Sequence, residues 1–469
     1  MSPLNEQPCL VDFSRSSRFG LRGRLFSNVG MLGVARLLAA LMGVATLVIT
    51  AKALSNNEAF GTLLFVHAYM LFFSEVVSFQ TWQAIIRFGS DEVKTKNVKR
   101  FSQLVKTGLM LDAVAALLAF VTASVCFSLF SWAMANLSLG ENANSVPNLM
   151  GGDLRQLVII YCSVIIFRQT NVAIGVFRLF DKFSVLALRA LVMPSLRLIG
   201  VMIAAHKGWG LVGFLSVWYL ASLISYLVLQ VCAALEIFNR GFWPTIWREK
   251  LCRTKDYPGL YSFIIKTNVD SAIESLKTNF PSLAVMIVFG PAILAVYRIA
   301  EEISRLLTRG VKMFDQVLFP ELSRMAVDID FRRLSRTTAK TAIAMGLAGS
   351  LISLVVLIFG KRLLEMGFDA SFSKAPALSV LLLVATTIVG IATPFYTAFY
   401  VLKRPDTAIW VRLFGAVSFI GAFLILSRYF GLFSIGWAAI LGASIELIMV
   451  VFLIRVILKN QTRRMSCHD

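Results

Sequence analysis

The chain is poor in charged residues and in the side chains on which many enzyme active sites depend. Only 15% of its 469 residues are Asp, Glu, Lys or Arg, and it contains 3 histidines. These histidines, His67, His206 and His468, share no spacing typical of metal ligands. The sequence also lacks a nucleophile–base pair and a glycine-rich phosphate loop. These absences argue against the enzyme classes that need such groups, so we expect no catalytic residues, no metal and no cofactor.

The 6 cysteines do not form a disulfide framework. Three lie in apolar segments and three in segments predicted to be cytoplasmic, and no two share a predicted external loop. We therefore expect no disulfides.

Apolar residues, in contrast, are abundant along the whole chain. They make up 57% of the sequence, and the mean hydropathy is +0.75. A soluble protein of this size is not so apolar over its full length, so the composition predicts an all-α polytopic membrane protein. The net charge of +20 would suggest nucleic-acid binding in a soluble chain. Here the Lys and Arg content of cytoplasmic loops explains it, and no nucleic-acid partner is expected.

About twelve segments are long and apolar enough to cross a bilayer as helices, since about 20 residues suffice. They are predicted near residues 27–54, 59–86, 104–135, 154–177, 183–205, 209–238, 261–289, 291–320, 339–360, 376–401, 407–430 and 434–458. The loops between them alternate between rich and poor in Lys and Arg. This alternation places both termini in the cytoplasm.

The sequence predicts two related halves. The segment that starts at Val48 parallels the one that starts at Val285, and the segment from Phe177 parallels the one from Tyr400. With six helices in each half, the repeats would run parallel, and such bundles bind cargo between their halves. Chance similarity between apolar helices is the alternative explanation. The predicted organisation is a tail (1–26), an N-terminal half (27–238), a connector (239–258), a C-terminal half (259–458) and a second tail (459–469).

The predicted span at 291–320 is unusually charged. Its charged residues are Arg298, Glu301, Glu302, Arg305, Arg309, Lys312 and Asp315, and five of them, at 298, 302, 305, 309 and 312, share one helical face. A charge at the bilayer centre costs at least about 2.5–3.5 kcal/mol, so this face must point into a bundle or a wet cavity.

Spacings of four residues predict that Glu301 pairs with Arg305 and Glu302 with Arg298. Arg309 and Lys312 then leave the face net positive. One interpretation is a ladder of ion pairs that fixes helix packing. We favour the other, a cationic wall that lines a path for an anionic substrate.

Several stretches carry a family resemblance. They are GPAILAVYRIAEEISRLLTRGVKMFDQVLFPELSRM, AKALSNNEAFGTLLF, Phe88-Gly89-Ser90 and the segment from Phe395 to Pro405. They resemble the bacterial polysaccharide transporters, the O-antigen and exopolysaccharide flippases. The superfamily of these transporters also includes multidrug and toxin extruders and the lipid II flippase. The resemblance covers nearly the full chain, but its motifs are loose patterns of small, aromatic and basic residues.

The resemblance implies a flippase in the bacterial inner membrane. Its substrate would be an oligosaccharide linked to a polyprenyl diphosphate, which it would move from the cytoplasmic to the periplasmic leaflet. Such a transporter can also work with a polysaccharide polymerase and a chain-length regulator.

The basic residues fit this cargo, because a diphosphate needs positive charge in a low-dielectric path and arginine offers forked donors. The predicted substrate-binding residues of a central cationic cavity are Arg36, Lys277, Arg298, Arg305, Arg309 and Lys312. Candidates for H⁺ or Na⁺ coupling are Glu75, Asp270, Glu274, Glu301 and Glu302, together with Asp112 and Glu446. Each of these acids can equally be a counter-charge for an arginine. Arg168, Arg189 and Arg412 lie nearer the cytoplasmic ends, where their side chains can snorkel.

Two other functions remain open. An ion-coupled exporter of drugs or cations from the same superfamily would need an acidic cavity, whereas this charged face is net positive. A membrane glycan polymerase or ligase would need catalytic groups on a sizeable external loop, and the largest such loop, 136–153, contains neither His nor Arg. Transport by a non-enzyme is therefore the function that the sequence favours.

Overall fold

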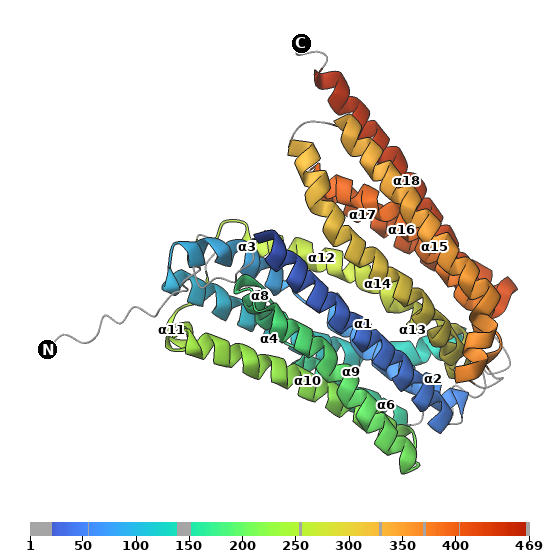
Figure 1. The fold of residues 1–469 in the computed structure, drawn as a ribbon. Coiled ribbons are helices and arrows are strands. Elements are labelled where there is room, and N and C mark those ends of the chain that lie inside the picture. The colour runs from blue at the N-terminus through green and yellow to red at the C-terminus, as the bar shows by residue number, and fades with distance from the viewer. Residues whose placement is uncertain are drawn as a thin grey trace. The chain divides into compact units, whose positions relative to one another are not determined.

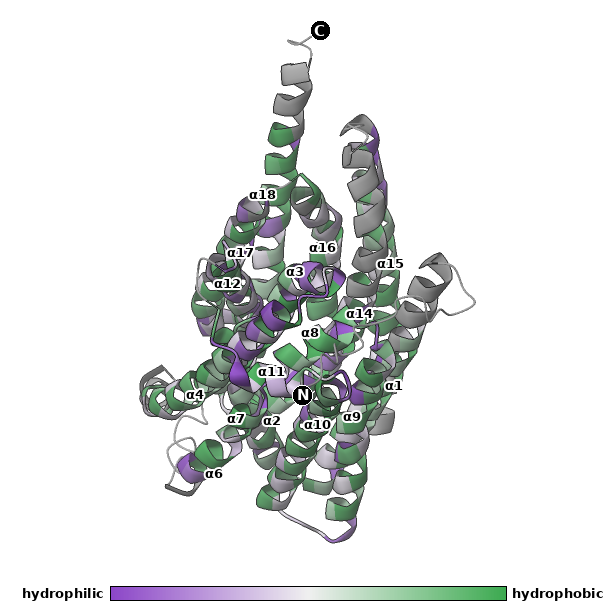
Figure 2. Cartoon of the chain, turned by 90° about the vertical axis from the view of Figure 1, so that its left-hand side faces the viewer, coloured by the Kyte–Doolittle hydropathy of each residue, from purple (hydrophilic) through white to green (hydrophobic). Residues whose placement is uncertain are grey.

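The computed structural model describes residues 21–54, 56–137, 152–252, 256–327, 331–368, 372–402 and 404–465. Throughout these residues the chain forms helices and the turns that connect them, without a strand, which confirms the predicted all-α fold. Nine segments of the described chain are apolar and long enough to cross a membrane, and the last of them, Asp406–Ile457, contains two helices. Figure 2 shows apolar residues along most of α9 (Phe183–His206) and α10 (Leu211–Asn239).

The chain divides into two compact units. Unit 1 comprises Met1–Ala53, Val66–Trp132 and Leu149–Ser275, and unit 2 comprises Leu54–Phe65, Ala133–Asn148 and Leu276–Asp469. Four helices have residues in both units: α2 (Asn57–Val76), α12 (Leu260–Thr278), α1 (Leu21–Leu54) with its last residue in unit 2, and α4 (Val98–Leu137) with its last five residues there. The predicted boundaries of the two six-helix halves stay a prediction.

Unit 1 contains all or part of the ten helices from α1 to α11, coloured blue to green in Figure 1, and most of α12. Besides α2, α9 and α10 they are α1 (Leu21–Leu54), α3 (Thr81–Lys94), α4 (Val98–Leu137), α6 (Gly152–Cys162), α7 (Val164–Phe167), α8 (Asn171–Leu179) and α11 (Trp243–Arg248). The short helix α8 packs against α3, and α9 packs against α10. A core of Ile85, Phe101, Val176, Ile237 and Phe242 joins α3, α4, α8 and α10.

Unit 2 is organised around α16 (Ala375–Val401), which packs against α14 (Pro291–Val327), α15 (Phe331–Gly367) and α18 (Ser434–Met465). The helix α17 (Pro405–Phe430) packs on α18, and α13 (Phe280–Phe289) packs on α14. A turn of 3₁₀-helix, η3 (Gly431–Phe433), joins α17 to α18. Leu322, Leu334, Phe399, Val411 and Val450 form a buried core between these long helices.

Three of the predicted spans are broken rather than continuous. The second span breaks between α2 and α3, the fourth between α7 and α8, and the seventh at Asn279 between α12 and α13. The eighth is longer than predicted, because α14 continues through Pro320 to Val327. The prediction that this helix ends at Pro320 was therefore wrong, since a proline removes one backbone hydrogen bond but need not end a long helix.

The start of α2 makes an unusually close backbone approach within unit 2. A Cβ atom at Gly61 would lie 1.8 Å from the carbonyl oxygen of Pro291, the first residue of α14. That oxygen belongs to the backbone, so it cannot rotate away as a side chain would. Gly290 precedes it with a φ of 83°, in the left-handed region that glycine adopts at least cost. The sequence Gly290-Pro291 therefore ends α13 and begins α14 in a turn that only a glycine at position 61 can contact so closely.

A buried carboxylate connects four helices of unit 2. Glu446 of α18 is 3% exposed and accepts hydrogen bonds from the Lys277 ammonium and the Tyr396 hydroxyl. The Arg412 guanidinium of α17 lies 5.0 Å from the centre of the Tyr396 ring. A Cβ atom at Gly415 of α17 would lie only 2.7 Å from Glu446 Oε2. The carboxylate thus holds the end of α12 against α16, α17 and α18.

We predict that Gly61→Ala destabilises the protein, because the added methyl group must displace the backbone of α14. The expected cost is about 1–3 kcal/mol, typical of overpacking. Gly43→Ala in α1 is the matched control, since its Cβ would meet no atom within 4 Å. The midpoints of thermal unfolding in detergent compare the two. An unfolding midpoint of Gly61→Ala equal to that of Gly43→Ala would contradict the prediction.

We also predict that Glu446→Gln destabilises unit 2, because it leaves the Lys277 ammonium without its counter-charge. The side chain of Lys277 is 23% exposed, so we expect a loss of about 3 kcal/mol, the low end for a broken buried pair. The double variant Lys277→Met/Glu446→Gln removes both charges and should recover most of this loss. Thermal unfolding measures it, and a double variant less stable than Glu446→Gln would refute the pairing.

Candidate functional site

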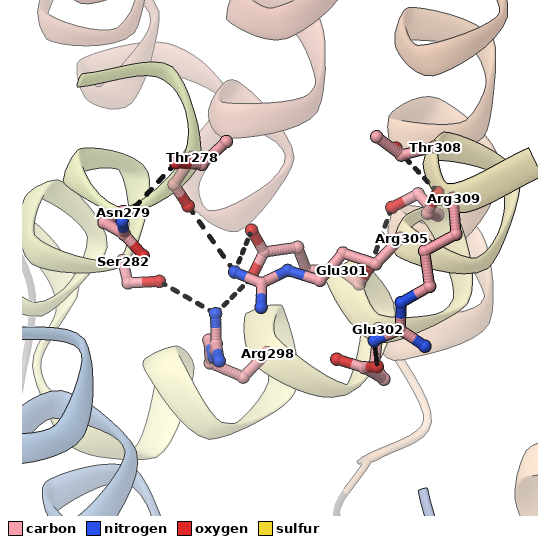
Figure 3. Close-up of polar contacts among 10 residues, drawn as sticks. Thr278, Asn279, Ser282, Arg298, Glu301, Glu302, Arg305, Thr308 and Arg309 are labelled. Carbon is pink, nitrogen blue, oxygen red and sulfur yellow. Dashed lines mark hydrogen bonds and ion pairs between the residues drawn. The ribbon is translucent and has the colours of Figure 1, made fainter. Parts of the chain in front are cut away.

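The charged face of α14 is a connected set of ion pairs within unit 2. Glu301 bridges two arginines: its Oε2 accepts from Arg298 Nη1 at 2.6 Å, and its Oε1 accepts from Arg305 Nη2 at 3.2 Å. Figure 3 shows the two guanidinium groups converging on this carboxylate from adjacent turns of the helix. The side chains of Arg298 and Glu301 are only 10% and 13% exposed. Glu301 therefore neutralises one of the two positive charges that it contacts.

A second ion pair lies further along the same helix. Arg309 Nη2 donates to Glu302 Oε1 at 2.9 Å, across two helical turns. The other terminal nitrogen of Arg309, Nη1, is buried and has no hydrogen-bond partner in the described structure, although the side chain as a whole is 41% exposed. Arg309 thus retains a donor that no described protein group satisfies.

These pairs differ in part from the predicted ones. The pair of Glu301 and Arg305 is present as expected, but Arg298 pairs with Glu301 instead of Glu302, and Glu302 pairs with Arg309. Spacings of three and four residues both bring helical side chains together, so spacing alone does not select the partner. Three arginines and two glutamates leave these five residues with one excess positive charge. The side chains of Lys312 and Asp315 lie outside the described residues.

The break between α12 and α13 adds polar groups to this face. Arg298 Nη1 lies 3.5 Å from the Ser282 hydroxyl of α13, and Arg305 Nη2 lies 3.5 Å from the backbone carbonyl of Thr278 at the end of α12. Figure 3 shows these groups next to Asn279, where the two helices meet. A broken helix inside a membrane protein exposes backbone groups that must find partners, and here an arginine supplies one.

The other predicted site residues belong to helices other than α14. Lys277 is paired with Glu446, so its charge is neutralised within the core of unit 2. Arg36 is exposed on α1, and Asp270 and Glu274 are half-buried on α12. Glu75 of α2 forms an ion pair with Arg168 at 3.2 Å. The last four residues belong to unit 1. Their roles in substrate binding or ion coupling stay predictions.

The sequence analysis did not predict a set of polar side chains in unit 1. These side chains lie at the breaks between α2 and α3 and between α7 and α8. Free backbone carbonyls there accept hydrogen bonds from side-chain amides. Asn171 Nδ2 donates to Phe79 O at 2.9 Å, Asn268 Nδ2 to Ser78 O at 2.7 Å and Gln230 Nε2 to Phe167 O at 2.7 Å. The signal was present in the segments SFQT (78–81) and RQTN (168–171), which are polar runs inside apolar spans.

Asp112 of α4 forms hydrogen bonds with the first turns of α3 and α8, the two helices that follow these breaks. Its carboxylate is buried and accepts from Thr81 Oγ1 at 2.7 Å, at the start of α3, and from the backbone N–H of Val172 at 3.2 Å, at the start of α8. A carboxylate is favourable at a helix N-terminus, where unpaired N–H groups and the helix dipole meet. Asp112, a candidate for ion coupling, therefore has a structural role at two helix starts.

Within the described residues, no three His, Cys, Asp or Glu side chains are grouped as a metal site would require. The polar groups described above are instead arginines with their carboxylate partners, amides and hydroxyls. Such a set suits the binding of a polar or anionic group.

The protein is similar to known membrane proteins in sequence and in fold. A family model described as "Polysaccharide biosynthesis protein" matches residues 25–326, more than half of the chain. The inner membrane protein YghQ of Escherichia coli K12 is 26% identical over 351 residues, which are 75% of this chain and 94% of that protein.

The fold resembles two solved transporters. An inward-facing multidrug resistance MATE family transporter of the MOP superfamily has a TM-score of 0.69 and 13% identity, over 92% of this chain and 99% of that one. The lipid II flippase MurJ in an inward closed conformation has a TM-score of 0.65 and 12% identity, over 90% of this chain and 87% of that one. The fold is thus that of MATE and MurJ transporters, and the extensive match to the family model shows that the chain is a membrane protein of the polysaccharide biosynthesis family.

Proposed function

We propose that this protein is a flippase for an oligosaccharide linked to a polyprenyl diphosphate, the repeat unit of an O-antigen or exopolysaccharide. It would move this lipid from the cytoplasmic to the periplasmic leaflet of the bacterial inner membrane by alternating access. Two findings support the substrate class. The chain belongs to the polysaccharide biosynthesis family, and one of the structures that share its fold is a lipid II flippase.

The charged face of α14 carries the proposal. Its arginines lie within a bundle of apolar helices, where each charge is costly unless it has a role or a partner. The excess positive charge and the unpaired Nη1 of Arg309 favour an anionic ligand. A guanidinium binds two phosphate oxygens at once, which makes arginine well suited to a diphosphate. The polyprenyl tail would remain in the bilayer while the head group passes the charged face.

Energy for transport would come from H⁺ or Na⁺ coupling. Candidate groups are Glu75, Asp270 and Glu274 in unit 1, and Glu301 and Glu302 on α14. A polysaccharide polymerase and a chain-length regulator are candidate partners.

An exporter of drugs or cations is the second candidate function, because the fold is also that of a MATE transporter. Such an exporter would attract cationic cargo with acidic groups. On α14, however, Glu301 and Glu302 are already paired with arginines.

The first experiment compares a strain that lacks this protein with its parent. We expect the deletion strain to accumulate polyprenyl-diphosphate oligosaccharide on the cytoplasmic side and to lose surface polysaccharide, and mass spectrometry of the extracted lipid identifies the repeat unit. Sensitivity to cationic dyes without lipid accumulation would favour the exporter. Accumulation on the periplasmic side would favour a polymerase or ligase.

We also predict that Arg305→Ala and Arg309→Ala fail to restore surface polysaccharide to the deletion strain. A hydrogen bond to a charged group contributes about 1.5–3 kcal/mol, so each variant should lower transport by at least about tenfold. Arg336→Ala, at an exposed position of α15, is the matched control and should restore it fully. Full activity of both α14 variants at normal abundance in the membrane would show that the charged face only fixes helix packing.

A further inference from the structure

One arginine inside unit 1 lies at the centre of a connected set of polar and aromatic side chains. Arg197 of α9 donates from Nη2 to Ser222 Oγ of α10 at 2.9 Å, and its Nη1 and Nη2 both lie 3.4 Å from His67 Nε2 of α2. His67 Nδ1 lies 2.8 Å from the Tyr161 hydroxyl of α6. These contacts connect four helices within unit 1. We call these four residues, together with Trp218 of α10, the Arg197 cluster.

The described acceptors of Arg197 are neutral. A guanidinium can only donate, so His67 accepts at Nε2 and carries its proton on Nδ1, which donates to Tyr161. Ser222 offers a neutral hydroxyl. Within the described residues, therefore, Arg197 forms no ion pair, whereas each arginine of the charged face of α14 pairs with a glutamate. A positive charge inside an apolar bundle is costly without a counter-charge.

Two buried donors of the cluster, Arg197 Nε and Trp218 Nε1, have no hydrogen-bond partner within the described residues. Only four buried side-chain polar atoms of the described chain are in this condition, and the other two are Ser102 Oγ and Arg309 Nη1. Arg197 and Trp218 are in contact, because the guanidinium carbon lies 4.5 Å from the centre of the Trp218 ring. Trp218 is only 4% exposed. Two donors on contacting side chains therefore need an acceptor that no described protein group provides.

A small anion meets both requirements. It accepts hydrogen bonds from several N–H groups and supplies the negative charge that the neutral acceptors lack. A water molecule can also accept from two donors, but it carries no charge and has two hydrogens that need acceptors of their own. The cluster is lined by rings, since the His67 ring lies 5.0 Å from the Trp218 ring and 6.0 Å from the Tyr161 ring. This packing favours a monatomic ion over a larger anion.

We propose that the Arg197 cluster binds a chloride ion, which accepts hydrogen bonds from Arg197 Nε and Trp218 Nε1. The ion is the counter-charge of Arg197 and stabilises the contact between α9 and α10. Through His67, which accepts from the same guanidinium, it also stabilises the contact of α9 with α2. The inference does not depend on the proposed cargo, because every residue that carries it lies within unit 1 and its ligand is a resident inorganic ion.

Equilibrium dialysis of the purified full-length protein in neutral detergent tests the site, with radioactive chloride as the probe and gluconate to keep the ionic strength constant. We expect saturable binding by the parent. Trp218→Phe removes the indole N–H but keeps an aromatic ring, and it should weaken binding by at least about tenfold, as the loss of a hydrogen bond to a charged group does. Arg197→Lys keeps the charge but lacks the Nε donor, and it should also bind more weakly. Trp247→Phe, the same change at an exposed tryptophan of α11, is the matched control and should bind as the parent does.

Thermal unfolding gives a second readout that needs no radioactive probe. Replacing gluconate with chloride should raise the unfolding midpoint of the parent and of Trp247→Phe, because a ligand that binds only the folded state stabilises it. Trp218→Phe should lose most of this rise. Since the comparison is made within each variant, it holds even where a substitution lowers the stability of the protein itself.

Three results would overturn the inference. If the parent shows no saturable binding, water rather than an anion satisfies the two donors. If Trp218→Phe and Arg197→Lys bind as tightly as the parent while Arg309→Ala does not, the chloride binds at the charged face of α14. If inorganic phosphate displaces chloride with equal affinity, the site is not built for a monatomic ion. The flippase proposal is tested separately, by the lipids of the deletion strain.

Discussion

The structure depends on one constraint, that a charge or a free backbone group inside an apolar bundle needs a partner. The long helices of unit 2 meet this requirement with carboxylates. Glu446 receives hydrogen bonds from a lysine and a tyrosine on two other helices, and Glu301 receives them from two arginines of its own helix. Each such pair lowers the cost of burying its members and specifies which helices meet. Charge burial thus contributes to the specificity of packing in unit 2.

In unit 1 the same constraint applies to the backbone groups at the helix breaks. Amides of Asn171, Asn268 and Gln230 satisfy carbonyls at the breaks, and Asp112 satisfies donors at two helix starts. These contacts make irregular backbone tolerable at membrane depth.

The pairing of charges on α14 bears on mechanism. A transporter must bind its cargo firmly enough to select it and weakly enough to release it. In the proposed function, the charged face of α14 would bind a diphosphate during passage. Glu301 and Glu302 would then moderate the affinity of the arginines with which they pair. The fold shared with MATE and MurJ transporters is compatible with several cargoes, so the substrate depends on such side chains rather than on the architecture.

The sequence by itself determined the all-helical membrane fold, the approximate position of most long helices and the charged face of α14. Hydropathy and helical periodicity are local properties, and they can be read without knowledge of the partners. Only the tertiary structure decided which residue each charge meets: Lys277 pairs with Glu446 across 169 positions of sequence, and Arg298 pairs with Glu301 rather than Glu302. It also revealed the helix breaks and the side-chain amides that satisfy their carbonyls. Ion pairs and backbone satisfaction depend on separations of a few ångströms between distant segments, which packing sets and residue spacing along the chain does not.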